Sequence, residues 1–400
     1  MGLKVVIISN DFRVYWRGRL TYLNNFLAGN GIQLFAIELF GKGSPYSFDE
    51  FDGQHSWWTC LFPDSDAAQL SNSEITTRLF NSLTSINPDV VITSPITFFA
   101  GALGLRWAKK NKKKHIMFDD AKPRLQFKRN LLVRWIRDTL TAQTDALWLP
   151  SADYDKEYET SNKAKTVFIY GFNCIDNDFF KPRIPKTFNS KTIVCVARLV
   201  PVKNLNRLLH AWREVESEVS DWKLYLIGEG PLHADLTELT AQLELKHVTI
   251  EGAVNYPLLP RYLQNADALI LPSLSETWGL VVNEAMAAGL PILLSNKVNA
   301  AESLLNDGVN GYVFDPEKIE DISNALLKLV RSEEAEKCKM SEQSLKIISE
   351  LDYKNMGERL LLGLHIMRTL KFRKPSIIGG LFINLWPGKH DISAWNNLKS

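Results

Sequence analysis

The chain has 400 residues, more than one hydrophobic core usually organises, so two domains are expected. Its 47 Lys and Arg nearly balance 45 Asp and Glu, and the net charge of +2 excludes a nucleic-acid-binding protein that is basic over its whole surface. The four cysteines show no metal-binding spacing, and no apolar run reaches the ~18–20 residues of a membrane-spanning helix. We therefore expect a cytoplasmic protein without disulfides, secretory signal or membrane span.

Short apolar runs alternate with helix-like segments over residues 1–172. The runs are KVVII (4–8), QLFAIEL (33–39), DVVIT (89–93), HIMFD (115–119), DALWL (145–149) and TVFIY (166–170). Such runs are typical of buried parallel strands, so this part is predicted to be an N-terminal Rossmann-like α/β domain.

The stretch 173–190 contains two prolines and is interpreted as an interdomain linker. The alternation then resumes over 191–352 with TIVCVAR (192–198), KLYLIGE (223–229), HVTIEG (247–252), DALIL (267–271), PILLS (291–295) and GYVFD (311–315). A last helix from about Tyr353 to Leu370, followed by an irregular tail, is expected to pack back on the first domain, so that 353–400 belongs to it. The predicted architecture is two doubly wound domains facing across a cleft that binds a ligand.

Two carboxylates flank a glycine in SLSETWGLVVNEAMAAGLP, residues 273–291. The apolar spacing after Gly279 and the stop at Gly289 predict a helix between two strands. Glu276 would lie in the loop, and Glu284 would lie about one turn inside the helix and lean back toward the loop. Helix amides attract phosphate and carboxylates accept hydrogen bonds from sugar hydroxyls, so the pair indicates a ligand with both groups. In the alternative interpretation, Glu276 caps the helix and Glu284 is a solvated helix residue.

Two cations follow the first strand of the second domain, in CVARLVPVKNLNRLLHAW (195–212). Arg198 ends the strand, and Lys203 precedes a helix that Asn204 could cap. Positive charge held there would stabilise a departing diphosphate. Solvated loop cations are the alternative.

Four segments carry a resemblance to a known family. They are VARLVPVKNLNRLLHAW (196–212), LYLIGEGPL (224–232), VTIEGAV (248–254) and PSLSETWGLVVNEAMAAGLPILLSN (272–296). In order and spacing they resemble the second domain of glycosyltransferase family 4, the retaining GT-B nucleotide-sugar transferases, and Glu276 and Glu284 match both ends of that family's E-x7-E motif. The resemblance is specific over about 168–315 and weak before residue 165.

The resemblance implies a GT-B fold and a role for each of these residues. Arg198 and Lys203 would bind the diphosphate and stabilise it as it leaves, and Glu276 would contact the donor sugar, which makes these three the implied catalytic residues. The other implied donor contacts are Glu284 at the ribose, Thr277, Gly279 and Leu280 in the loop and helix entrance, and Ala253 and Val254 near the base. The implied reaction needs neither a metal nor a cofactor beyond the nucleotide-sugar co-substrate.

The first domain departs from the family pattern in two places. Where family members commonly have adjacent glycines after the first strand, this chain has SNDFRVYWRGRLTYL (9–23), so Gly18 is the candidate donor contact and Arg19 a candidate for the phosphate or the acceptor side. Where the family often has a histidine after the fourth strand, this chain has Asp119 and Asp120, and His115 is expected inside the strand. Asp119 is assigned to the acceptor side; acids that merely end a strand, or a metal-binding pair, are the alternatives.

Cations gather in KKNKKK (109–114) and in the basic segment 122–140, where Leu132 and Trp135 share one helical face. Such a helix is either a contact with an anionic membrane or an ordinary helix with a solvated basic face, and both interpretations stay open. KFRK (371–374) followed by SIIGGLFINLW (376–386) again places cations next to an apolar stretch.

These observations predict a retaining glycosyltransferase that moves a sugar from a nucleotide-diphosphate sugar, for example a UDP-sugar, to a glycan or lipid-linked acceptor. Bacterial polysaccharide, lipopolysaccharide or glycolipid biosynthesis is the expected setting, in the cytoplasm or at the inner face of the membrane. The alternatives are an epimerase or phosphorylase on the same scaffold, and a non-catalytic nucleotide-sugar-binding subunit. A dehydrogenase is disfavoured because no G-x-G-x-x-G follows the first strand.

Overall fold

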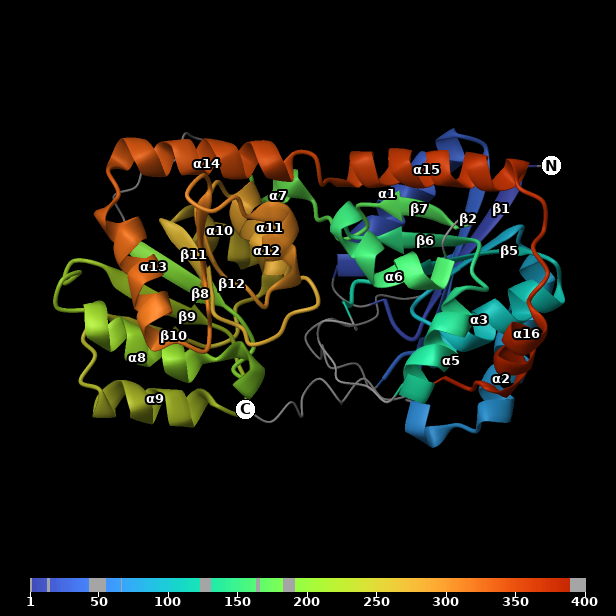
Figure 1. Ribbon diagram of the computed structural model, residues 1–400, viewed down its shortest axis with the longest axis horizontal. Coiled ribbons are helices and arrows are strands. Elements are labelled where there is room, and N and C mark those ends of the chain that lie inside the picture. Colours follow the sequence, from blue (N-terminus) through green and yellow to red (C-terminus); the bar gives the residue numbers. More distant parts are fainter. Residues whose placement is uncertain are drawn as a thin grey trace. The chain divides into compact units, whose positions relative to one another are not determined.

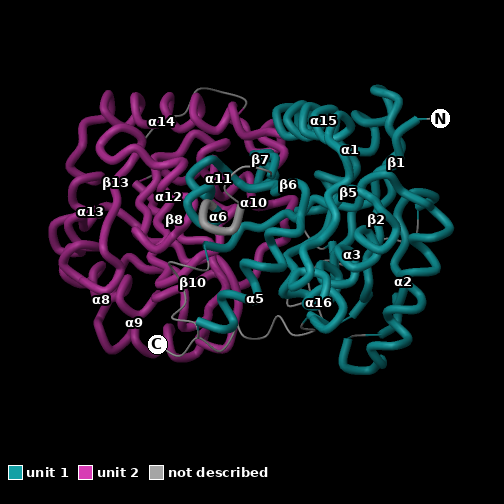
Figure 2. The backbone as a smooth tube through the Cα atoms, turned by 45° about the vertical axis from the view of Figure 1, so that its right-hand side comes forward, with its two compact units in different colours: residues 1–174, 353–394 teal, residues 175–352, 395–400 magenta. Residues whose placement is uncertain are grey.

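The computed structural model describes residues 2–12, 15–42, 55–65, 67–122, 131–162, 166–182 and 191–388, with only the backbone of 159–162. The described chain divides into two compact units (Figure 2). Among the described residues, the first unit consists of the chain up to Cys174 together with 353–388, and the second consists of Ile175–Asp352. Each unit contains one parallel sheet with helices, which confirms the predicted α/β fold class.

The sheet of the first unit has seven parallel strands in the order β3-β2-β1-β4-β5-β6-β7. The strands are β1 (Leu3–Ser9), β2 (Ile32–Phe40), β3 (Trp58–Phe62), β4 (Val90–Thr93), β5 (Lys114–Phe118), β6 (Ala146–Leu149) and β7 (Val167–Tyr170). Each of the six predicted strands is present. The additional strand, β3, lies at the sheet edge and pairs only with β2 among the described strands.

The helices of the first unit come from both ends of the chain. They are α1 (Tyr15–Gly29), α2 (Asn72–Ile86), α3 (Phe99–Lys110), α5 (Leu131–Thr141), α6 (Asp155–Asn162), α15 (Tyr353–Thr369) and α16 (Ile377–Leu385). Helix α15 packs on α1 and β7, and Figure 1 shows its red ribbon beside the blue ribbon of α1. None of the described helices has the length and apolar character of a membrane span.

The prediction of an irregular tail after residue 370 is wrong, because α16 lies within it. The Ser376 hydroxyl accepts a hydrogen bond from the backbone N–H of Gly379 and so caps the helix. A Cβ on Gly379 would lie 2.4 Å from the side chain of Gln143, so this glycine permits close packing after α5. Gly379 is therefore a packing feature of this helix.

The sheet of the second unit has six parallel strands in the order β10-β9-β8-β11-β12-β13. The strands are β8 (Thr192–Val196), β9 (Lys223–Ile227), β10 (Val248–Glu251), β11 (Ala268–Leu271), β12 (Ile292–Ser295) and β13 (Gly311–Phe314), all of them predicted. Strands β9 and β10 extend the sheet on one side of β8, and β11 begins the other side. The strand order therefore reverses between β8 and β11, where open parallel sheets bind their ligands.

The helices of the second unit all come from the continuous segment Ile175–Asp352. They are α7 (Asn177–Phe180), α8 (Leu205–Val215), α9 (His233–Gln242), α10 (Leu259–Gln264), α11 (Leu280–Ala287), α12 (Asn299–Leu304), α13 (Ile319–Arg331) and α14 (Glu334–Ile348). One core cluster combines Trp212 of α8 with Leu226 of β9 and Leu326 of α13. Helix α11 contains buried alanines and the buried Met286, so it packs closely and holds its N-terminus in place.

Candidate functional site

The candidate site lies at the carboxyl edge of the second sheet, in the loops that follow β8 and β11. These strands are adjacent and parallel, so both loops emerge at the same edge. The backbone N–H of Leu274 in the second loop donates to the carbonyl of Val202 in the first (2.8 Å). The two loops thus form one structure at the switch point of the strand order.

The loop after β8 contains Arg198 and ends in a short 3-10 turn, Pro201–Lys203. Asn204 has a φ of 58° and makes no side-chain cap on α8, so the predicted capping role is wrong. Its amide instead donates to the carbonyls of Pro272 (3.1 Å) and Pro316 (2.8 Å). Asn204 thereby ties three loops together, which a local sequence pattern does not indicate.

The loop after β11 enters α11 at Gly279, whose φ is 94°. A Cβ there would lie 3.2 Å from Cγ of Glu276 and 3.3 Å from Leu271, so both conformation and space favour glycine. The first amides of α11, at Leu280 and beyond, are the groups that an α-helix leaves for a capping anion.

Lys203 and Glu276 form an ion pair that joins the two loops. Nζ of Lys203 lies 2.6 Å from both carboxylate oxygens of Glu276. Their side chains are only 12% and 17% exposed. The structure thus brings together a predicted diphosphate cation and the predicted sugar carboxylate, and each neutralises the charge of the other.

The loop that carries Glu276 is held by contacts that sequence reasoning missed. Glu276 pairs with Val298 as an isolated parallel bridge, and the Asn299 amide donates to the carbonyl of Thr277 (2.9 Å). The indole N–H of the buried Trp278 donates to Oδ1 of Asn283 in α11 (2.9 Å). The only sequence signal for these contacts is Trp278, a large aromatic residue in a short loop.

The other donor-binding candidates lie along the same sheet edge. Glu284 sits one turn inside α11 and is 1% exposed, so its carboxylate is not a solvated surface group. Ala253 is exposed and Val254 half-buried, and both follow β10 at the outer side of the sheet. These placements do not test the implied contacts, which stay predictions.

Two first-unit candidates, Gly18 and Arg19, lie in α1. Arg19 is 2% exposed, its Nε donates to the carbonyl of Cys174 (2.9 Å), and its guanidinium lies over the ring of Trp16. Gly18 faces α15, because a Cβ on it would lie 2.2 Å from the hydroxyl oxygen of Tyr353. These contacts give both residues a packing role, and their predicted ligand roles stay untested.

Gly18→Ala is expected to destabilise the first unit by about 1–3 kcal/mol, because the added methyl overlaps the Tyr353 hydroxyl. Adding Tyr353→Phe should recover part of the loss in thermal unfolding. Gly29→Ala is the matched control in the same helix, since nothing lies within 4 Å of its Cβ position. Equal losses for the two alanine variants would contradict the assigned contact.

Asp119 follows β5 directly, and His115 lies inside that strand as expected. The Asp119 carboxylate accepts hydrogen bonds from the backbone N–H of Ala121 (3.0 Å) and from the hydroxyl of Tyr158 (2.8 Å). Burial raises the pKa of Asp119 to about 6, although both hydrogen bonds act in the opposite direction. The carboxyl therefore titrates close to neutral pH and positions its loop; an acceptor role stays a prediction.

The raised pKa of Asp119 predicts a pH dependence of unfolding. The pKa of Asp119 is 3.8 in the unfolded chain and about 6 in the folded protein, so the folded protein binds this proton more tightly. The stability that protonation of Asp119 contributes is therefore complete below about pH 4 and is lost as the pH rises through about 6. The change is at most about 3 kcal/mol. In urea titrations, Asp119→Asn should gain stability relative to the wild type across this range. A difference that stays constant with pH would refute the assignment.

The described residues contain no group of three or more His, Cys, Asp or Glu that could hold a metal ion. Asp119 and Asp120 therefore do not belong to such a group among these residues. Catalysis without a metal stays a prediction. Residues 123–130, which contain part of the predicted basic segment, and residues 183–190 of the predicted linker lie outside the described residues.

Comparison with known proteins places a family match on the second unit. Residues 175–346 match the family model described as Glycosyl transferases group 1, and this range contains Arg198, Lys203, Glu276 and Glu284. An uncharacterised glycosyltransferase of Methanocaldococcus jannaschii is 23% identical over 247 residues, covering 62% of this chain and 67% of the relative. The poly(glycerol-phosphate) alpha-glucosyltransferase of Bacillus subtilis is 26% identical over 238 residues, which are 58% of this chain but only 34% of that protein.

A solved structure extends the likeness to both units. The Anabaena protein HepE in complex with UDP superposes with a TM-score of 0.69 and 13% identity, covering 91% of this chain and all of that one. At this identity the match establishes the fold alone. The chain therefore has the fold of the GT-B glycosyltransferases, and its residues 175–346 resemble the glycosyl transferases group 1.

Proposed function

We propose that the protein is a retaining glycosyltransferase that transfers a sugar from a nucleotide-diphosphate sugar to a hydroxyl of a glycan or lipid-linked acceptor. The observation that carries the proposal is the Lys203–Glu276 pair at the strand switch point, beside the entrance of α11. The family match over the same residues supports the reaction class. The UDP bound to HepE supports a nucleotide donor, and the Bacillus relative's name supports a polymeric acceptor.

In this proposal the donor diphosphate separates the ion pair. Lys203 and Arg198 bind the diphosphate, and the first amides of α11 take part of its charge. Glu276, released from Lys203, accepts hydrogen bonds from the hydroxyls of the donor sugar, and Glu284 accepts those of the ribose. Thr277, Gly279 and Leu280 line the diphosphate, and Ala253 and Val254 lie toward the base.

The proposed transfer exchanges one bond at the anomeric carbon for another on the same face. The bond from this carbon to the diphosphate oxygen breaks, and the acceptor oxygen forms the new bond. The acceptor proton passes to the departing phosphate, so the step needs no protein base and no metal or cofactor. Fixed positive charge at Lys203 and Arg198 stabilises the diphosphate as its charge develops.

Thermal unfolding in the presence of UDP-, GDP- and ADP-sugars tests the donor site. A donor at 100 times its dissociation constant should stabilise the protein by about 2.7 kcal/mol, and only one base is expected to do so at low concentration. Glu276→Ala should weaken this shift, whereas Glu320→Ala, an exposed acid at the start of α13, should leave it unchanged. The proposal fails if no nucleotide sugar stabilises or is turned over.

Product analysis separates the competing functions. A transferase releases nucleoside diphosphate in proportion to glycosylated acceptor, an epimerase converts the donor without any acceptor, and a phosphorylase consumes inorganic phosphate or a sugar phosphate. Donor-induced stabilisation without turnover over a broad acceptor panel would favour a binding subunit.

A further inference from the structure

The first unit exposes large apolar side chains on two neighbouring helices, α5 and α16. The contact between the helices includes an edge-to-face pair of Trp135 and Phe382 with ring centroids 5.1 Å apart. Leu131 is 79% exposed and Ile377 is 94% exposed. The other exposed large apolar residues of these helices are Leu132, Val133, Trp135, Ile378, Leu381 and Leu385. We call this set the α5–α16 surface; contiguous apolar surface of this kind marks an interaction site.

Helix α16 presents its apolar face from a fixed position. Ile377, Leu381 and Leu385 are spaced by four residues and share one helical face, and α16 contains no charged residue. Gly379 and Ile383 are buried on the other side of the helix, and its C-terminal end is anchored because Arg106 donates to the carbonyls of Ile383 (2.8 Å) and Trp386 (2.9 Å). An apolar face held this firmly is preorganised for a partner.

The α5–α16 surface is hollowed where the two helices meet. An open groove of about 500 Å³ lies between α5 and the start of α16. Its lining combines the apolar Leu131 and Trp135 with polar residues, among them Arg134 and Asp138, which lie 3.9 Å apart. The groove therefore adds apolar surface, and its own charges offset each other.

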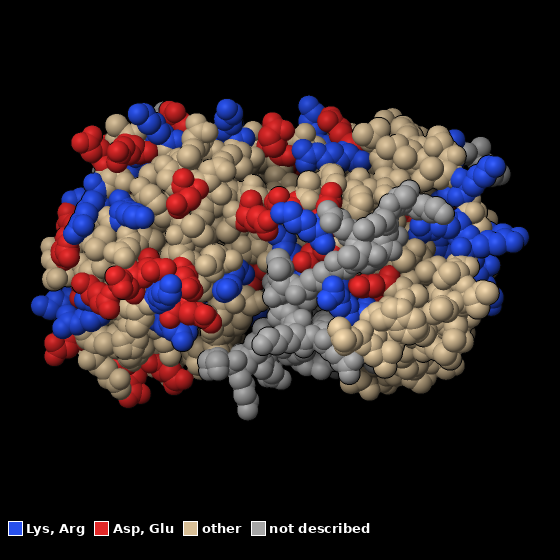
Figure 3. Space-filling view, in the orientation of Figure 1, with Lys and Arg blue, Asp and Glu red and all other residues tan. Residues whose placement is uncertain are grey.

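Cations border this surface. The exposed cations of the segments 110–114 and 371–374 are Lys110, Lys112, Lys371 and Lys374. Neither segment contains an acid, and Asp138 is the one acid of α5. Nζ of Lys114 donates to the carbonyl of Lys371 (2.8 Å), so the two cationic segments adjoin. In Figure 3 the part of the first unit that carries α5 and α16 is largely tan, with blue side chains along one side.

We propose that the α5–α16 surface docks on a lipid bilayer that contains anionic headgroups. Apolar side chains beside a cationic border fit the boundary between headgroups and acyl chains, where the cations gain from anionic lipid. The charge border favours this occupant over an uncharged protein face. This docking is separate from the transfer reaction. It favours the membrane-contact interpretation for α5, and α16 supplies the remaining apolar residues of the surface.

Vesicle sedimentation tests the docking with the full chain. The protein should bind vesicles of equimolar phosphatidylglycerol and phosphatidylcholine at least about tenfold more tightly than vesicles of phosphatidylcholine alone. Ile377→Ser/Leu381→Ser should weaken binding to the anionic vesicles by at least about tenfold. Lys371→Gln/Lys374→Gln should reduce the preference for phosphatidylglycerol, and added salt should do the same.

Leu362→Ser/Ile366→Ser is the matched control, because these exposed apolar residues lie on α15 of the same unit. The control should bind vesicles as the wild type does. Absence of binding to anionic vesicles, an equal loss in the control, or a dimer in solution that Ile377→Ser/Leu381→Ser dissociates without any vesicle binding would each overturn the proposal. Donor-induced thermal shifts without vesicles report on the second unit, so failure of docking and failure of the proposed reaction are distinguishable.

Discussion

Lys203→Met is expected to lower kcat about 10²- to 10³-fold with the donor identified by thermal shift, because the charge that develops on the departing diphosphate loses a positioned cation. The methionine keeps most of the apolar stem, so packing changes little. Lys223→Met is the control, since Lys223 is exposed and begins β9 at the opposite edge of the same sheet. Steady-state measurement of kcat and KM separates a loss in the transition state from a loss of ground-state binding.

The partner of Lys203 requires a second comparison. Lys203→Met removes the ion pair that Glu276, a residue 17% exposed, makes with Lys203, and the loss of this pair can itself destabilise the loop. Lys203→Met/Glu276→Gln removes both charges, so it should regain thermal stability but no activity. If the double variant recovered kcat, Lys203 would serve only to hold the loop. A single variant with wild-type kcat would remove Lys203 from the proposed mechanism.

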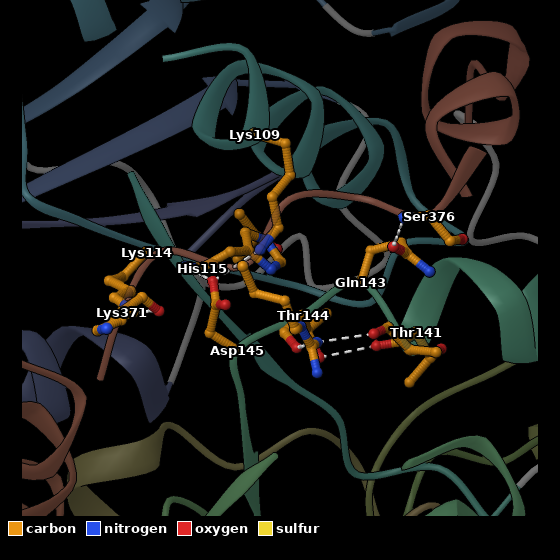
Figure 4. A network of polar contacts seen from close by, with 12 residues as sticks. Lys109, Lys114, His115, Thr141, Gln143, Thr144, Asp145, Lys371 and Ser376 are labelled. Atoms are coloured by element: carbon orange, nitrogen blue, oxygen red, sulfur yellow. Dashed lines mark hydrogen bonds and ion pairs between the residues drawn. The ribbon is translucent and has the colours of Figure 1, made fainter. Parts of the chain in front are cut away.

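Asp145→Ala is expected to destabilise the first unit by about 3–5 kcal/mol, because it strands a buried cation. Figure 4 shows the contacts: Oδ2 of Asp145 accepts from Nζ of Lys109 (2.8 Å) and from the backbone N–H of His115 (2.9 Å). The Lys109 and Asp145 side chains are 3% and 5% exposed. Burial lowers the pKa of Lys109, and the charge of Asp145 opposes that shift.

Urea titration followed by a probe in the first unit measures this loss. Lys109→Met/Asp145→Ala should be less destabilised than Asp145→Ala, because no charge is left buried alone. Glu218→Ala in the second unit is the control: its ion pair with Arg331 is exposed, such pairs contribute about 0–1 kcal/mol, and the transition of the first unit should not change. A double variant as unstable as the single one would mean that lost packing, not the stranded charge, sets the cost.

The sequence predicts the strands of both sheets well because parallel strands buried on both faces are continuous apolar runs. The exception, β3, lies at a sheet edge, where pairing with β2 decides the conformation. Helix α16 escaped prediction for a related reason, since its glycines are poor helix formers and its stability comes from Gln143 and Arg106. Tertiary contacts, not local preference, determine both elements.

The candidate site shows the same division. Glu276 and Gly279 can be recognised because one loop and one helix entrance carry a local pattern. The ion pair of Glu276 with Lys203 joins residues 73 positions apart, and the amide of Asn204 reaches Pro316 across 112 positions. Such contacts form only between loops whose strands are neighbours in the sheet. The spacing of residues along the chain does not indicate which strands are neighbours.

The return of the chain to the first unit has a consequence for folding during synthesis. The second unit is contained in Ile175–Asp352, whereas the first unit needs α15, which begins at Tyr353. Until α15 emerges from the ribosome, the surface of α1 at Phe26 and of β7 at Ile169 is uncovered, although both were made much earlier. The later part of the chain can therefore finish folding before the earlier part, and the apolar surface of the earlier part stays accessible to chaperones until α15 is made.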